Sequence, residues 1–402
     1  MRNMKRFNFI LLFFLFFLHT LDNYIREVQW NRGMMVFLKN AFLAGMVLLF
    51  LMELYCFSGK RTIKSVFIDE LKSIIWLTVT FAVLSVYEML KNQGFETATI
   101  KGLIRLLIPV FTAFVILNVM EFDDIYRVMA ISLCFMFAGY VAAHVGDLSI
   151  GNFCSVSFVD SYSPFESNFF SPAAMGFCLF FCYFRKNKLF TFLSVLFTIL
   201  TFKRIMVLYA VVLLLFGGMV SKWKEMPKWL LRMLGVIIFI FSILYIQLML
   251  GNVAKLLFKY FGIEINRTVI DIFSMGRSWF IQLVLEGDFR SVGFMSSTVG
   301  FKNMEMDLPM IYIEMGILSV AATIYFMLRL VKNNWYVFGI IGFCLLELLT
   351  SHWFDITYFW IVAYVTVGCI QYRQPEPDME SKTPGNLRQI IKRFVNSWRI
   401  KT

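Results

Sequence analysis

The sequence predicts an all-α integral membrane protein with about twelve transmembrane helices. Of its 402 residues, 59% are hydrophobic and only 16% are charged, whereas soluble chains average about 45–50% apolar and about 25% charged residues. Apolar runs recur along the whole chain, and a helix of about 20 residues crosses the hydrocarbon core of a bilayer. Lipid cannot hydrogen-bond to an open backbone, so we expect each run to be helical. A β-barrel would show alternating segments of about 10 residues instead.

The predicted spans follow the apolar runs in chain order. They cover residues 7–21, 34–57, 71–90, 100–120, 126–145, 169–184, 189–202, 205–220, 230–250, 308–328, 335–350 and 353–371. The first resembles a signal peptide, but no small-x-small cleavage site follows Leu18, so we expect it to remain as a span. The chain is therefore expected to form one membrane domain, 1–371, with a long loop at 251–307 and a basic amphipathic tail at 372–402.

The distribution of Lys and Arg predicts the orientation, because short cytoplasmic loops collect these residues. With both termini in the cytoplasm of a bacterial inner membrane, 24 of the 38 Lys and Arg lie in cytoplasmic segments. The net charge of +12 mostly reflects this topology. We expect no nucleic-acid partner, since nucleic-acid binding requires a basic face on a soluble domain.

The loop 251–307, between the ninth and tenth spans, is predicted to be periplasmic. In 252–262, NVAKLLFKYFG, apolar and lysine residues occupy opposite helix faces, which is typical of a helix lying on a membrane surface. A second short helix is expected at 275–286. The loop carries half of the external basic residues: Lys255, Lys259, Arg267, Arg277, Arg290 and Lys302. The positive-inside rule does not explain them, so an anionic ligand is expected there.

The tail ends in NLRQIIKRFVNSWRIKT, in which an apolar helical stripe lies opposite basic residues. This pattern favours a cytoplasmic surface helix held by anionic membrane lipids. Binding of a dedicated partner protein is the alternative.

Four short motifs, together with the long loop before the last three spans, give the chain a family resemblance. They read Gly276-Arg277-Ser278-Trp279, Ser291-Val292-Gly293-Phe294, a D-x(8)-G element from Asp307 to Gly316, and Thr201-Phe202-Lys203-Arg204. The layout resembles that of the O-antigen and capsule polymerases, which are related to the O-antigen ligases. The resemblance implies a metal-independent, cofactor-free glycosyltransferase. It would move a growing glycan from undecaprenyl pyrophosphate to the next lipid-linked unit, with a chain-length regulator as a partner protein.

The pyrophosphate leaving group requires fixed cations to stabilise its developing charge. Arginine suits phosphate because its planar fork donates two hydrogen bonds at once. Arg277 is the first candidate, Arg204 the second and Arg290 the third. Lys203 and Arg105 are further substrate-binding candidates. Each cation is alternatively an exposed loop charge or a lipid-headgroup contact, and Arg105 alternatively extends along its span to the interface.

Two carboxylates are candidates for positioning or deprotonating the acceptor hydroxyl. Asp307, at the mouth of the tenth span, is the better placed, and Glu305 lies two residues upstream. The alternative for Asp307 is a helix N-cap. O-antigen ligases typically carry a histidine at the start of this element, and its absence favours a polymerase while leaving the base unidentified. The three histidines, His19, His144 and His352, share no metal-ligand spacing and are expected to be interfacial polar residues.

Two other functions remain open. A lipid-linked oligosaccharide flippase has a similar number of spans, but it should show two matched halves and charges at mid-membrane depth. The sequence shows one outsized external loop and charges near the outer rim instead. An O-antigen ligase is the alternative within the enzyme class.

Overall fold

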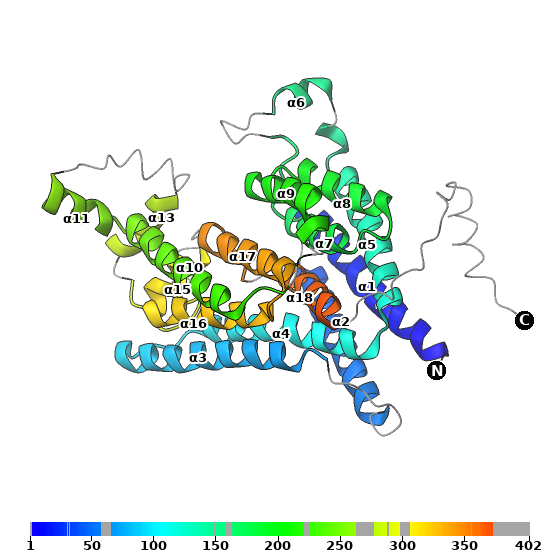
Figure 1. Ribbon diagram of the computed structural model, residues 1–402, viewed down its shortest axis with the longest axis horizontal. Helices are drawn as coiled ribbons and strands as arrows, with labels where there is room; N and C mark the ends of the chain where they lie inside the picture. Colours follow the sequence, from blue (N-terminus) through cyan, green and yellow to red (C-terminus); the bar gives the residue numbers. More distant parts are fainter. Residues whose placement is uncertain are drawn as a thin grey trace, which may run out of the picture.

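The computed structural model describes residues 2–29, 31, 33–57, 66–147, 149–156, 163–220, 223, 225–262, 277–287, 289–297, 306–354 and 356–372. These residues form α-helices and two short 3-10 helices, with no strand among them (Figure 1). The predicted all-α architecture is therefore confirmed for this part of the chain. Glu305, Asp355 and the tail beyond residue 372 lie outside the described residues.

Six helices in the described part of the chain are long and apolar enough to cross a membrane. They are α1 (Arg2–Glu27), α2 (Gly33–Phe57), α3 (Ile68–Asn92), α4 (Thr97–Val119), α5 (Phe122–Ala143) and α10 (Lys228–Met249). By length and composition the chain is thus a multi-pass membrane protein.

Shorter apolar helices complete the bundle. They are α7 (Ser171–Phe184), α8 (Lys188–Leu200), α9 (Arg204–Val220), α16 (Ile317–Leu328) with η2 (Arg329–Val331), and α17 (Trp335–Thr350). The remaining elements are η1 (Val145–Asp147), α6 (Ile150–Cys154), α11 (Asn252–Phe261), α13 (Arg277–Glu286), α15 (Asp307–Met315) and α18 (Thr357–Tyr372).

The predicted tenth span, 308–328, is wrong as a single continuous helix. Gly316 separates α15 from α16, with φ 76° and ψ −172°, a conformation that only glycine adopts at little cost. The Ser319 hydroxyl lies 2.9 Å from the Ile311 carbonyl oxygen and satisfies part of the open end of α15. Irregular backbone at membrane depth is tolerated where protein surrounds it, and most of α15 is buried.

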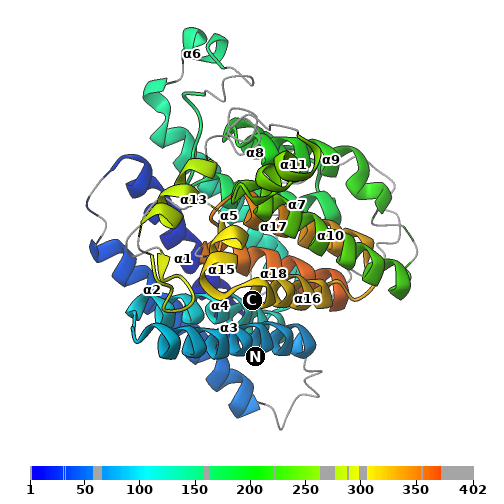
Figure 2. The ribbon, with the colours of Figure 1, turned by 90° about the vertical axis from the view of Figure 1, so that its left-hand side faces the viewer.

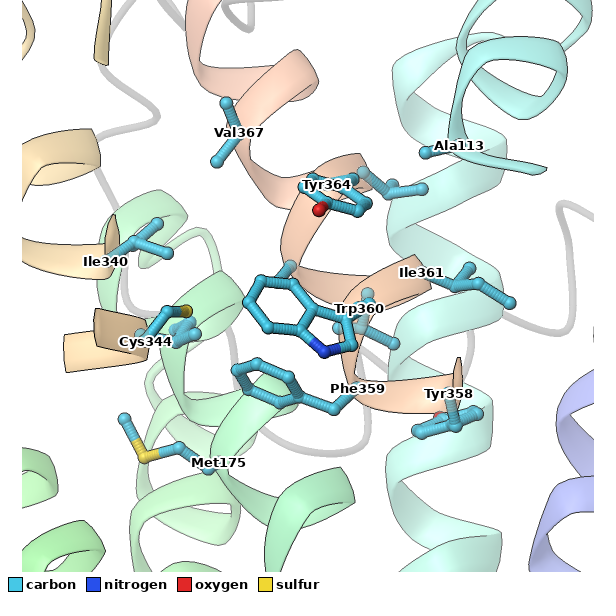
Figure 3. Close-up of a cluster of buried hydrophobic side chains, with 14 of the residues drawn as sticks. Ala113, Met175, Ile340, Cys344, Tyr358, Phe359, Trp360, Ile361, Tyr364 and Val367 are labelled. Carbon is cyan, nitrogen blue, oxygen red and sulfur yellow. The ribbon is translucent and has the colours of Figure 1, made fainter. Parts of the chain in front are cut away.

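Helix α18 forms the centre of the bundle (Figure 2). It packs against α4 on one side and α7 on the other, and its residues from Tyr358 to Ile370 are buried. Figure 3 shows Phe359, Trp360 and Tyr364 projecting from α18 among side chains of α4, α7 and α17. The residues between α17 and α18 are therefore attached to the most buried helix of the molecule.

Contacts between helix ends define two ends of the bundle. At one end, here called the site end, the Ser167 hydroxyl donates to Glu27 at 2.6 Å, and the Asp307 N–H donates to the Ser351 carbonyl at 3.2 Å. At the opposite end, Lys186 pairs with Asp123 at 3.0 Å and Lys332 with Glu70 at 2.8 Å.

Candidate functional site

Asp307, the first residue of α15, is fully buried and accepts hydrogen bonds from the turn between α17 and α18. Its Oδ2 receives the backbone N–H groups of Trp353 at 2.5 Å and Phe354 at 2.7 Å. Its Oδ1 lies 2.5 Å from Nδ1 of His352. The helix-cap alternative is wrong, because Met306 occupies the cap position and no side chain caps the helix. The carboxylate holds the neighbouring turn instead.

The Asp307 carboxylate fixes the state of the His352 ring. An ionised carboxylate can only accept hydrogen bonds, so Nδ1 of His352 must be the donor. In the neutral imidazole the proton is then on Nδ1, and Nε2 is left as an acceptor. The His352 side chain is 27% exposed whereas that of Asp307 is 0% exposed. The pair thus places a partly exposed imidazole at the edge of the bundle, hydrogen-bonded to a fully buried carboxyl group.

The turn that carries His352 is anchored on both sides. The Ser351 N–H donates to the Glu347 carbonyl at 2.6 Å, which continues the end of α17. On the far side, the Trp360 indole N–H donates to the Trp353 carbonyl at 2.9 Å. Because Trp353 is buried and packs against Phe359 of α18, with ring centroids 4.3 Å apart, the position of the imidazole is set by packing as well as by Asp307.

The packing of α13 brings its first residue, Arg277, towards the start of α15. Ile281, one turn after Arg277 on the same helix face, is buried and packs in a small cluster with Met249 and Met306. Met306 immediately precedes Asp307. The start of α13 is thereby held beside the start of α15, although the two are separated by 30 residues of sequence.

Glu347 is a buried carboxyl group on which two of the predicted cations act. This carboxylate lies on α17, one turn before Ser351, and is 2% exposed. The positive charges of Lys203 and Arg277 both act on it. Lys203 also pairs with Glu166, at 2.7 Å. Lys203 and Arg277 therefore lie within electrostatic range of Glu347, one turn before Ser351, whose carbonyl accepts the Asp307 N–H.

Arg204 is next to Lys203 and opens α9. The turn before it includes Phe202 in the left-handed conformation, at φ 52°. This turn separates α8 from α9 and places both cations at the site end, as the sequence predicts. Arg204 is half-buried and engaged in an interaction of its own.

Arg290 lies apart from the Asp307–His352 pair, whereas Arg105 shares a pocket with Phe354, whose N–H donates to Asp307. Arg290 is exposed and precedes Ser291, whose hydroxyl donates to the Glu314 carbonyl at 2.6 Å. Glu314 is seven residues along α15 from Asp307, a rise of about 10 Å. Arg105 is exposed on α4 and lines a small pocket together with Phe354 and Trp360.

Glu314 joins two of the predicted motifs. Its buried carboxylate accepts the backbone N–H groups of Met295 and Ser297, each at 2.8 Å, and the Ser297 hydroxyl at 2.6 Å. Gly293 has φ 115°, and a Cβ there would lie 2.6 Å from the Ser85 side chain. The segment around Gly293 is thus fastened to the end of α15, which gives this glutamate an anchoring role.

His352 is the functional candidate that sequence reasoning missed. It is 45 residues from Asp307 in sequence, and its motif SHWF carries no ligand spacing or other pattern. The expectation of an interfacial polar histidine did not include its pairing with Asp307. Within the described ranges, no group of three or more His, Cys, Asp or Glu residues is arranged to hold a metal ion.

Comparison with known proteins adds no assignment: neither a protein-family model nor a curated protein matches this chain. The site combines His352, paired with the buried Asp307, with the positive charges of Lys203 and Arg277, which act on Glu347. This combination suits a reaction in which a hydroxyl loses a proton while an anionic group departs.

Proposed function

We propose that the protein polymerises lipid-linked oligosaccharide repeat units at the periplasmic face of a bacterial inner membrane. In this reaction the growing glycan leaves undecaprenyl pyrophosphate and is joined to the terminal sugar of the next lipid-linked unit. The observation that carries the proposal is the Asp307–His352 pair at one end of an apolar helical bundle, where the charges of Arg277 and Lys203 act on nearby Glu347. The motif resemblance supports the same reaction class.

In the proposed mechanism His352 is the general base. Its Nε2 receives the proton of the acceptor sugar hydroxyl as that oxygen bonds to the anomeric carbon of the donor. Asp307 keeps the ring in the tautomer that can accept this proton and stabilises the imidazolium that results. The bond between the anomeric carbon and the pyrophosphate oxygen breaks, and its electron pair leaves with the pyrophosphate.

The cations stabilise the departing pyrophosphate. Arg277 provides a bidentate fork, while Lys203 and Arg204 provide positive charge from the junction of α8 and α9. Glu166 pairs with Lys203 at 2.7 Å and holds this cation before substrate enters. Because the charges come from the protein, the proposed reaction requires no metal ion or other cofactor.

The orientation is part of the proposal. Lys5, Lys186 and Lys332 lie at the opposite end of the bundle, where the positive-inside rule would place the cytoplasm. The site end then faces the periplasm. Helix α11, whose residues are exposed or half-buried, would lie on the outer leaflet. A chain-length regulator is the proposed protein partner.

Deleting the gene tests this function against its alternatives. We expect surface lipid capped with a single repeat unit, because transport and ligation continue while polymerisation stops. The control is the same strain carrying a plasmid copy of the gene, which should restore the ladder of longer glycans. Loss of every repeat unit would overturn the proposal and favour a flippase or a ligase.

A further inference from the structure

A groove between α10 and α16 lies far from the proposed catalytic corner, near the opposite end of the bundle. It encloses about 430 Å³. Its walls are mainly apolar and include Val236, Phe239, Ala321 and Ile324. Ala321 contributes only a methyl group to the wall, and Leu328 approaches Gly235 so closely that a Cβ there would lie 2.9 Å from its Cδ1.

Two arginines stand at one end of this groove. Arg232 lies one turn inside the start of α10, and Arg329 follows the end of α16. Both are exposed. The guanidinium of Arg329 lies 5.9 Å from the centre of the Tyr325 ring, which also lines the groove. Lys228, four residues before Arg232, adds a third positive charge on the same face of α10.

Exposed aromatic side chains mark this level as a membrane interface. Trp229 on α10 is 66% exposed and Tyr325 on α16 is 59% exposed. Tryptophan and tyrosine concentrate where the hydrocarbon core meets the headgroups. The arginines therefore lie at headgroup level, and the apolar part of the groove runs from there towards the membrane interior. From Arg232 to Phe239 it follows α10 for about 10 Å.

We propose that this groove binds one acidic phospholipid, with the phosphate between Arg232 and Arg329 and an acyl chain along Val236, Phe239 and Ile324. Charge complementarity selects this occupant. A zwitterionic lipid would bring its own cation to a site that already carries two. An apolar helix of another protein would cover both arginines without neutralising them, and burial of unpaired charge is costly. This lipid site is independent of the reaction proposed for the other end.

The binding test uses the full-length protein in nanodiscs and native mass spectrometry. Phosphatidylglycerol and phosphatidylcholine of identical acyl chains are the probes. We expect wild-type protein to retain one phosphatidylglycerol after delipidation and to lose phosphatidylcholine. Each arginine near an anionic surface contributes about fivefold in affinity, so Arg232→Gln with Arg329→Gln is expected to weaken retention about 25-fold.

Two further variants separate the site from general surface charge. Ala321→Phe fills the groove while leaving both arginines in place, and it should abolish retention of the bound lipid. Lys188→Gln removes an exposed cation from the same end of the bundle but away from the groove, and it should leave retention unchanged. Equal retention of the two lipids, equal loss in Lys188→Gln, or occupation of the groove by a second copy of the chain would overturn the proposal.

Discussion

Replacing Asp307 with asparagine changes the chemistry of the site while keeping its shape. The amide oxygen can still accept the N–H groups of Trp353 and Phe354, which both contact Oδ2 in the native protein. The amide NH₂ then replaces Oδ1 and donates to Nδ1 of His352. The imidazole proton moves to Nε2, and the ring loses the acceptor that the proposed reaction uses.

The expected size of the effect follows from these contacts. A positioned general base contributes about 10²–10⁴ in rate, so Asp307→Asn should lower the rate of polymerisation by about that factor. Its stability should fall less than that of an alanine variant, because the three hydrogen bonds of this side chain lose their charge assistance but keep their partners. Asp307→Ala would leave two buried N–H groups without partners, at about 1–3 kcal/mol each, and should fold poorly.

The assay compares glycan ladders and purified protein yields for Asp307→Asn, His352→Gln and the double variant. The two single variants should lose activity to the same extent, and the double variant should be no worse than either, because both remove one functional unit. Size-exclusion profiles matching wild type provide the folding control. A full-length ladder in Asp307→Asn with normal expression would refute the assignment of His352 as the oriented base.

The remaining predictions concern the arginine, the helix break and the topology. Arg277→Lys keeps the charge but loses the bidentate fork, so polymer formation should fall about tenfold or more with normal protein levels; full-length glycan would remove Arg277 from the site. Gly316→Ala forces a methyl group onto a left-handed φ and should cost about 1–3 kcal/mol, visible as a lower Tm in detergent, whereas Gly342→Ala, inside α17 with open space around its Cβ, should leave Tm nearly unchanged. A reporter fused near residue 280 should be active only on the periplasmic side, and cytosolic activity would contradict the orientation of the site.

Helix positions were largely predictable from the sequence because the length and place of each apolar run determine them. The expected spans 34–57 and 335–350 correspond to α2 (Gly33–Phe57) and α17 (Trp335–Thr350). The break at Gly316 was not predictable in this way. Apolar residues continue on both sides of it, and glycine is common within transmembrane helices. Only the backbone conformation reveals that α15 and α16 are separate helices.

The charged residues of the candidate site were predictable, but their contacts with one another were not. Asp307, Arg277 and Lys203 could be selected because they lie at predicted helix ends on one side of the membrane. Their convergence depends on how α13, α15 and α17 pack, which periodicity does not encode. The role of His352 required knowing that the turn before α18 folds over Asp307. Glu305 lies outside the described residues and stays a prediction.

Reconstitution of the purified protein in liposomes tests the central claim most directly. Supplied with synthetic undecaprenyl-pyrophosphate-linked repeat units and a chelator, wild-type protein should produce glycans of several units together with free undecaprenyl pyrophosphate. Asp307→Asn protein in the same liposomes should produce neither. Movement of intact lipid-linked units across the bilayer without any new glycosidic bond would contradict the claim and identify a transporter.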